Sequence, residues 1–306
     1  MKRNIHIDLL KTLAAFGVIV IHTAAAPLSG VVGTPRWFAA LIPAVLFRGS
    51  VPVFLMCSGA LLLSSERELP LRRLYGHYIP RLLLLWLVWH IIYIKTGTTG
   101  HLYYFGILLL FYAGCPILRI LTCHASREQL YYVLGFWLIL GILYPMVLQY
   151  PPVSGIGGIP RQWAVNMAYA AWGYALLGYT LEQYPLKPGV SIALFVFGFS
   201  LTIALTAALS LQTGKLCTSF LEGMSVGPAL MAAGIWGICG WLRPNATAIT
   251  ALSKAAFCSY SVHVFFLRLI PPIPSVLLLA VINEICCLAA YGILSRVPLV
   301  RRLVIW

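Results

Sequence analysis

Long apolar runs separated by short polar segments recur along the whole chain. Most hold about 20 residues, the length that an α-helix rising ~1.5 Å per residue needs to cross a ~30 Å hydrocarbon core. The last two runs are separated only by a proline-rich segment, 271–274, which favours a tight hairpin. The pattern predicts an all-α, polytopic membrane bundle that fills residues 1–306 as a single domain. We count ten transmembrane helices, at 12–28, 41–63, 78–94, 102–121, 130–148, 163–181, 190–211, 224–242, 257–272 and 274–294.

The basic residues favour one side of this bundle. With the N-terminus in the cytoplasm, fifteen of the 21 Lys and Arg residues fall on the cytoplasmic side. Because basic residues are retained there, the asymmetry predicts that both termini are cytoplasmic. The fifteen are Lys2, Arg3, Lys11, Arg67, Arg72, Arg73, Arg81, Arg119, Arg127, Lys187, Arg243, Lys254, Arg296, Arg301 and Arg302; the others are Arg36, Arg48, Lys95, Arg161, Lys215 and Arg268. The longest outer loop is expected at 149–161.

The composition agrees with a membrane protein, since 61% of the residues are hydrophobic and 9% are charged, unlike a soluble domain. The net charge of +14 is spread among short loops, so we expect no nucleic-acid partner. The eight cysteines form no CxxC pair or zinc-like spacing and are interpreted as packing residues, with no metal site. The N-terminus resembles a signal peptide, but Asp8 and Lys11 interrupt its apolar run, so we expect a retained first helix.

Four ionisable residues are expected near the middle of the membrane. Counting along the predicted helices places His22 and His90 at a similar depth from the inner side, and Arg48 and Glu284 at that depth from the outer side. Charged groups facing lipid are costly, so these four predict a polar, substrate-binding cavity within the bundle. Each also has a structural interpretation: either histidine can hydrogen-bond a neighbouring helix, Arg48 can extend to the interface, and Glu284 can pair with a base.

The first helix carries the most informative spacing. Lys11 precedes His22 by eleven residues, which separates them by roughly 16 Å along a helix axis. Lys11 is therefore expected at the membrane mouth and His22 near mid-membrane.

Four sequence blocks, in order, resemble the integral-membrane acyltransferase family 3. Asp8-Leu-Leu-Lys11 followed by His22 is similar to its first-helix signature, although the family usually has Arg where this chain has Lys11. Arg48-Gly-Ser-Val-Pro-Val-Phe-Leu-Met-Cys-Ser-Gly59 resembles its second-helix motif. His101-Leu-Tyr-Tyr-Phe and Phe257-Cys-Ser-Tyr-Ser-Val-His263 resemble two later motifs.

The resemblance implies a bacterial inner-membrane enzyme that O-acetylates surface polysaccharide. It would be an acyltransferase of groups other than aminoacyl groups, moving an acyl group, expected to be acetyl, from cytoplasmic acyl-CoA to a hydroxyl of a carbohydrate or lipid-linked glycan. Acyl-CoA enters as the donor substrate, and no bound cofactor is implied. Membrane lipids are the other expected partners.

The same resemblance suggests roles for individual residues. His22 acts either as the general base, an effect typically worth ~10²–10⁴-fold, or as a transient acyl carrier. Arg48 is the candidate for stabilising an oxyanion. His263 and His101 are expected to bind or orient the acceptor, and His263 is counted among the catalytic candidates. The phosphates of the donor are expected to bind cytoplasmic cations, namely Lys11, Arg72, Arg73 and Arg81. Asp8 is expected to orient the amine of Lys11.

Two other functions fit the same features. A transporter or flippase of a lipid-linked sugar also needs charges in mid-membrane, but it often has two matching halves with broken helices, and this sequence shows no such halves. A catalytically inactive member of the family is the third alternative, because Lys11 lacks the bidentate geometry of Arg.

Overall fold

The computed structural model describes residues 3–65, 68–95, 97–148, 167–242, 244–298 and 300–301, and all regular elements in these ranges are helical. Seven helical segments of this described part are long and apolar enough to cross a membrane, which supports a multi-pass membrane protein. They are Ile5–Leu28, Pro35–Leu62, Leu71–Ile94, Gly100–His124, Arg127–Met146, Pro188–Thr213 and Val276–Leu294. Several residues of the sequence-based topology lie outside the described residues, namely Lys2, Arg67, Arg161, Arg243, Arg302, the loop 149–161 and the beginning of the run 163–181.

The helices follow the expected order of apolar runs. Seven of the ten expected runs correspond to the long segments given above, and the runs 163–181, 224–242 and 257–272 correspond to α9, α11 and α12. The elements are α1 (Ile5–Leu28), α2 (Pro35–Leu46), α3 (Ser50–Leu62), α4 (Leu71–Arg73), the π-helix η1 (Leu74–Tyr78), α5 (Ile79–Ile94), the 3-10 turn η2 (Gly100–Leu102), α6 (Tyr103–His124), α7 (Arg127–Trp137), the π-helix η3 (Leu138–Leu143), α8 (Tyr144–Leu148), α9 (Met167–Gln183), α10 (Pro188–Thr213), α11 (Val226–Trp241), α12 (Ala246–Leu269) and α13 (Val276–Leu294).

The structure corrects three expected boundaries. The run 41–63 is not one helix, because α2 and α3 are separated at Phe47–Gly49. The first helix begins at Ile5, where Asn4 accepts a hydrogen bond from the amide of Ile7. Similarly, α12 begins at Ala246, well before the expected 257, since Asn245 caps it. Polar cap residues satisfy amides at a helix start, and hydropathy alone does not detect them.

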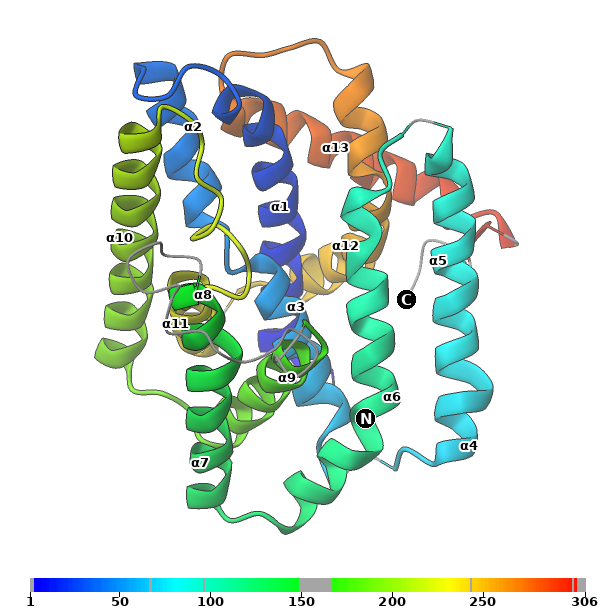
Figure 1. Ribbon diagram of the computed structural model, residues 1–306. Helices are drawn as coiled ribbons and strands as arrows, with labels where there is room; N and C mark the ends of the chain where they lie inside the picture. Colours follow the sequence, from blue (N-terminus) through cyan, green and yellow to red (C-terminus); the bar gives the residue numbers. More distant parts are fainter. Residues whose placement is uncertain are drawn as a thin grey trace.

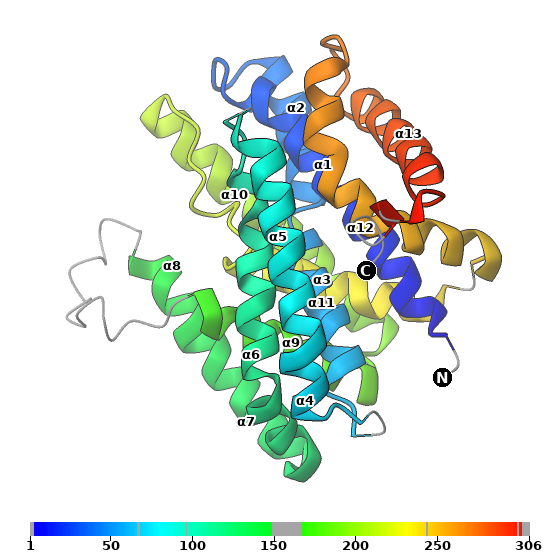
Figure 2. The same ribbon diagram turned by 90° about the vertical axis from the view of Figure 1, so that its right-hand side faces the viewer.

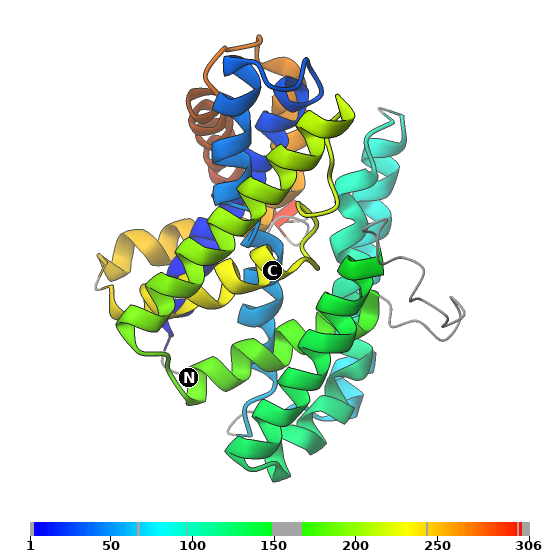
Figure 3. The same cartoon turned by 60° about the vertical axis from the view of Figure 1, so that its left-hand side comes forward.

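The bundle is arranged around α1 and α3. Figure 1 shows α10 on one side and α5 on the other, with α1 and α3 between them. The most extensive helix contacts are between α10 and α11, α3 and α9, and α1 and α12. Figure 3 shows α10 running obliquely past α11, and Figure 2 shows that α12 changes direction along its length.

The α10 helix buries small and polar residues and exposes large apolar ones. Its buried positions are Ser191, Gly198, Thr202, Thr206 and Ser210, and its exposed side chains include Val190, Ile192, Val196, Phe197 and Leu211. This is the reverse of a soluble helix. Small residues let two helices approach closely in lipid, whereas large apolar side chains are stable against lipid chains. The distribution supports a membrane-embedded α10.

Two glycines allow α3 and α9 to touch through their backbones. A Cβ atom at Gly59 would overlap the backbone of Ala175, and one at Gly178 would overlap the backbone of Met56. Both glycines are buried. The contact therefore requires a residue without a side chain on each helix.

We predict that Gly59→Ala and Gly178→Ala each destabilise the protein by about 1–3 kcal/mol, the usual cost of overpacking a close interface. Gly135→Ala in α7 is the matched control, because a Cβ atom there meets nothing within 4 Å. That substitution should be neutral or stabilise by up to ~1 kcal/mol through helix propensity. Thermal unfolding in detergent measures the stability of the three variants and the wild type. Melting temperatures of Gly59→Ala and Gly178→Ala equal to that of Gly135→Ala would contradict the proposed contact.

Candidate active site

Three histidine rings from distant parts of the chain meet inside the bundle. The ring centroids of His22 and His263 are 4.9 Å apart, those of His101 and His263 are 5.6 Å apart, and those of His22 and His101 are 6.4 Å apart. His22 belongs to α1, His263 to α12 and His101 to η2. We call these three residues the histidine cluster.

His263 is held in one orientation by the backbone of its own helix. Its Nδ1 lies 2.8 Å from the carbonyl oxygen of Tyr260 and 3.2 Å from that of Ser259. A carbonyl oxygen only accepts hydrogen bonds, so Nδ1 must carry a proton. In the neutral ring Nε2 then has a free lone pair, and this atom is buried without a hydrogen-bond partner. His263 thus offers a basic nitrogen to the interior.

Neighbouring helices fix this turn of α12. The hydroxyl of Tyr93 donates a hydrogen bond to the carbonyl oxygen of Ser261 at 2.8 Å. The side-chain amide of Asn283 donates one to the carbonyl oxygen of His263 at 3.0 Å. Side chains that bind carbonyl groups within a helix compete with its backbone bonds and favour bending. These contacts lie within the buried stretch of α12 and anchor it against α5 and α13.

His101 has a similar arrangement at the start of α6. Its Nδ1 lies 2.9 Å from the carbonyl oxygen of Thr98, so this nitrogen also carries the proton. Its Nε2 is buried and has no hydrogen-bond partner. The hydroxyl of Tyr260 donates to the carbonyl of His101, and the Tyr93 ring lies edge-on at 4.7 Å. The Nε2 atoms of both rings are thus unpaired, and the ring centroids of His101 and His263 lie 6.4 and 4.9 Å from that of His22.

Arg48 lies at the break between α2 and α3. The break packs closely on α11, because a Cβ atom at Gly49 would lie 3.2 Å from the backbone nitrogen of Ala232. The Nε atom of Arg48 is buried without a hydrogen-bond partner. Arg48 acts electrostatically on His22 and, in turn, interacts favourably with Glu222. Together with the N-terminus of α3, the cation forms a positive region suited to a developing negative charge.

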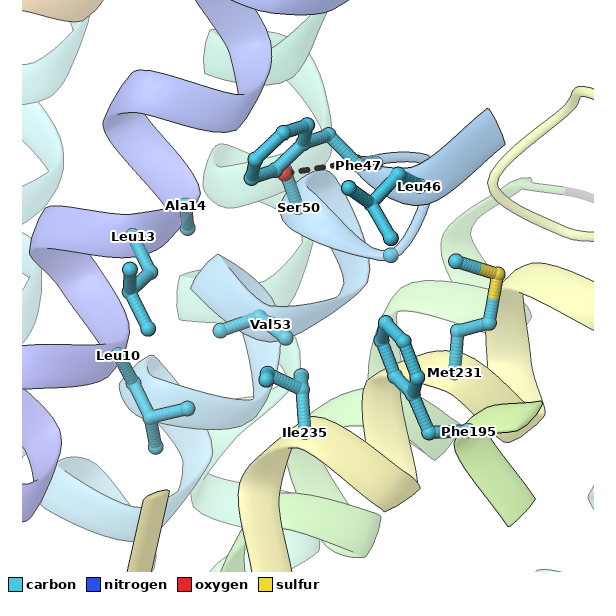
Figure 4. Close-up of a pocket in the computed structure, with 11 residues that line it drawn as sticks. Leu10, Leu13, Ala14, Leu46, Phe47, Ser50, Val53, Phe195, Met231 and Ile235 are labelled. Carbon is cyan, nitrogen blue, oxygen red and sulfur yellow. Dashed lines mark hydrogen bonds between the residues drawn. The ribbon is translucent and has the colours of Figure 1, made fainter. Parts of the chain in front are cut away.

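The other face of this break is apolar. Figure 4 shows Phe47, Ser50 and Val53 beside a pocket of about 230 Å³ between α1, α3, α10 and α11. The Ser50 hydroxyl is already bonded to the carbonyl of Phe47 at 2.7 Å. Arg48 does not line this pocket. The pocket beside the break is therefore apolar, and the charge of Arg48 lies outside it.

A large cavity opens beside His22 at the end of α1. It has a volume of about 620 Å³ and is bounded by the end of α1, the 30–36 segment, the end of α12 and the start of α13. His22, Thr34 and Arg36 are among its polar lining residues. We call it the His22 cavity.

A second cavity lies toward the beginning of α1. It has a volume of about 320 Å³, and three cations from three helices line it: Lys11 of α1, Arg81 of α5 and Lys254 of α12. Tyr260 lines the same cavity and stands 6.2 Å from the His263 ring. We call it the cation cavity. Tyr260 and the histidine cluster thus lie between the two cavities.

The structure does not bring every predicted site residue to this place. His90 on α5 joins neither the histidine cluster nor the two cavities. Arg72 is exposed on α4, and Arg73 lies over the ring of Tyr78, 5.5 Å from its centroid. Tyr78 itself lines the cation cavity, which places Arg73 at its edge.

Two predicted acids have other neighbours. The carboxylate of Asp8 accepts hydrogen bonds from Arg3, Thr250 and Ser253 and thereby joins α1 to α12. Glu284 accepts a hydrogen bond from Ser259 at 3.2 Å, and its Oε2 is buried without a partner. Neither carboxylate lines one of the two cavities, but Asp8 accepts a hydrogen bond from Ser253, which lines the cation cavity.

Sequence reasoning missed three residues that complete the arrangement. Tyr260 belongs to a motif quoted above but had no role, Lys254 was counted only as a cytoplasmic charge, and Tyr93 was not selected. Only Tyr260 carried a signal, because it stands one turn before His263.

The comparison with known families agrees with this geometry. Residues 4–96 match the family model described as an acyltransferase domain, Acyl_transf_3. This match supports a membrane acyltransferase. The matched segment contains Lys11, His22 and Arg48, whereas His101 and His263 follow it. No curated protein and no solved structure matched the chain.

We predict that His101 and His263 of this candidate acyltransferase are Nδ1–H tautomers when neutral, because each Nδ1 faces a carbonyl oxygen. Nitrogen-15 NMR of histidine-labelled protein in nanodiscs should show an unprotonated Nε2 for both rings. The spectra of His101→Gln and His263→Gln assign the two signals. A protonated Nε2 with an unprotonated Nδ1 on either ring would contradict the described orientation.

Proposed function

We propose that the protein is an O-acyltransferase of the bacterial inner membrane. It moves an acetyl group from cytoplasmic acetyl-CoA to a hydroxyl of a cell-surface carbohydrate or lipid-linked glycan. The observation that carries the proposal is the position of the histidine cluster between the cation cavity and the His22 cavity. In this proposal all ten apolar runs cross the membrane and both termini are cytoplasmic, so the two cavities open on opposite sides.

The cation cavity suits the donor. Coenzyme A carries several phosphate groups, and Lys11, Arg81 and Lys254 supply positive charge from three helices. Lys11 keeps the charge of the usual Arg but binds phosphate as a point charge. The narrow pantetheine arm then extends past Tyr260 and brings the thioester to the histidine cluster.

The reaction breaks the thioester C–S bond and forms an ester C–O bond. The hydroxyl proton must move to a base, and the coenzyme A sulfur must gain a proton on leaving. In one route His22 accepts the hydroxyl proton directly and then passes it to the departing sulfur. In the other, His22 attacks the thioester, the ring proton that His22 loses passes to the departing sulfur, and His22 carries the acetyl group as a neutral acyl-imidazole. Nε2 of His263 or His101 then accepts the hydroxyl proton and returns it to His22 as the ester forms. In both routes Arg48 stabilises the oxyanion of the tetrahedral intermediate.

We predict that His22→Ala lowers acetyl transfer from acetyl-CoA by at least ~100-fold, since it removes the base or acyl carrier. The assay follows radioactive acetyl in purified protein in nanodiscs. His124→Ala, at the exposed end of α6, is the matched control and should retain wild-type turnover. Normal turnover in a folded His22→Ala protein would exclude the proposed role.

The same assay distinguishes the two routes and the flippase alternative. Rapid denaturation at neutral pH leaves acetyl label on wild-type protein, and not on His22→Ala, when His22 carries the acetyl group covalently; the label should be lost in acid, where an acyl-imidazole hydrolyses. Measurement of glycan O-acetylation and glycan export in cells with and without the gene separates the enzyme from a flippase. Loss of export with unchanged acetylation would reject the acyltransferase.

We predict that Lys254→Gln raises the KM for acetyl-CoA about tenfold, equivalent to ~1.4 kcal/mol, because it removes a charge that faces the phosphates. S-acetylpantetheine lacks those phosphates, and its KM should be the same in the variant and the wild type. Lys187→Gln is the control, since Lys187 is exposed before α10, and its KM for acetyl-CoA should not change. An equal rise in the KM for acetyl-CoA and for S-acetylpantetheine would assign Lys254 a role other than phosphate binding.

A further inference from the structure

A third cavity shares α3 and α6 with the cation cavity but is lined by other residues of these helices. It has a volume of about 200 Å³ and is lined by residues of α3, α6, α8, α9 and the segment that connects α10 to α11. Its lining combines the rings of Tyr103 and Tyr174 and the ring of Pro52 with the carboxylate-bearing residue Glu222. We call it the Glu222 cavity. Aromatic and apolar walls with a few polar groups are typical of small-molecule sites.

Glu222 has its hydrogen-bonding capacity available. It is exposed, and within the described residues its carboxylate makes neither a side-chain hydrogen bond nor an ion pair. Arg48 and Tyr103 interact with it electrostatically without forming a bridge. An ionised carboxylate offers two oxygens that accept strong hydrogen bonds from hydroxyl groups.

The segment that carries Glu222 is held in place by its neighbours. The hydroxyl of Tyr174 donates to the carbonyl of Gly223, and the hydroxyl of Ser225 donates to the carbonyl of Ser219 at 2.8 Å. The backbone amide of Cys217 donates to the Ser210 hydroxyl at 2.9 Å. Glu222 is thus presented by an ordered segment, and this lowers the entropy cost of binding.

Arg48 connects this cavity to the histidine cluster. Arg48 precedes Val51 and Pro52, which line the cavity, by three and four residues, and Tyr103, which also lines it, follows His101 by two. A molecule in the Glu222 cavity therefore lies near the helix break that carries Arg48 and near the turn that carries His101. This is where the part of an acceptor adjoining its reactive hydroxyl would be placed.

We propose that the Glu222 cavity binds a neutral sugar ring of the acceptor. Glu222 accepts hydrogen bonds from the ring hydroxyls, and the faces of Tyr103 and Pro52 contact its C–H groups. An anionic sugar is disfavoured by repulsion from the carboxylate. The inference rests on the proposed acyltransferase function and names the substrate group that the site recognises.

The test measures binding separately from catalysis. Methyl α-D-glucoside, methyl α-D-mannoside and methyl α-L-rhamnoside serve as probes for protein in nanodiscs free of sugar-based detergent. Saturation-transfer NMR without donor gives the Kd of each, and radioactive acetyl-CoA gives the KM for each as acceptor. At least one glycoside should bind the wild type, and Glu222→Gln should raise its Kd and KM about tenfold with little change in kcat. Charge-assisted hydrogen bonds are the stronger kind, so loss of charge alone has this effect.

Glu68→Gln is the matched control, because Glu68 is exposed near the beginning of α4, and it should bind glycosides as the wild type does. Absence of glycoside binding to the wild type, or equal Kd values in wild type and Glu222→Gln, would overturn the inference. A fall in kcat without a change in Kd would also overturn it, since that pattern indicates a role in chemistry. If glycosides bind but acetyl-CoA is never consumed, the acyltransferase proposal fails and the sugar site remains.

Discussion

In a helix bundle surrounded by lipid, a polar group is stable only where another part of the protein satisfies it. The candidate active site depends on this constraint. Each of two buried histidines donates a hydrogen bond from Nδ1–H to a backbone carbonyl, and the carbonyls of Ser261 and His263 accept hydrogen bonds from the side chains of Tyr93 and Asn283. These bonds leave one nitrogen of each ring unpaired. The groups that hold the rings therefore also determine which nitrogens are left for chemistry.

The close packing of the helices gives these bonds their geometry. Backbone contact at Gly59 and Gly178 joins α3 to α9, and the small face of α10 joins it to α11. Because α11 in turn packs on Gly49, the contact with α11 fixes the position of the break that carries Arg48. Substitutions far from the histidine cluster can thus displace its cation. Small residues contribute little burial energy themselves, but they determine how near the polar groups lie to one another.

Much of the fold could be predicted from the sequence, because lipid requires long apolar runs and seven of the expected spans appear as long apolar helices. The counted depths of the residues did not predict which of them meet, and only the family resemblance indicated a role for His101 and His263. Counting along a helix gives depth but not the direction in which a side chain points, so His90 and His22 were placed together at one level. The structure instead groups His22 with His101 and His263. The helix break at Phe47–Gly49 was missed because the run 41–63 is apolar on both sides of Arg48-Gly49-Ser50, so that its hydropathy indicates a single span.

The separation of the two main cavities has a physical consequence for the proposed reaction. A continuous aqueous path would let water compete with the acceptor hydroxyl and would let ions cross the membrane. Here Tyr260 and the three histidine rings occupy the intervening region, with centroid separations of 4.9–6.4 Å. An acetyl group is small and uncharged, whereas coenzyme A is large and highly charged. A barrier built of these rings suits passage of the acetyl group alone, because only that part of the donor is transferred, either by way of His22 or directly, to the acceptor hydroxyl.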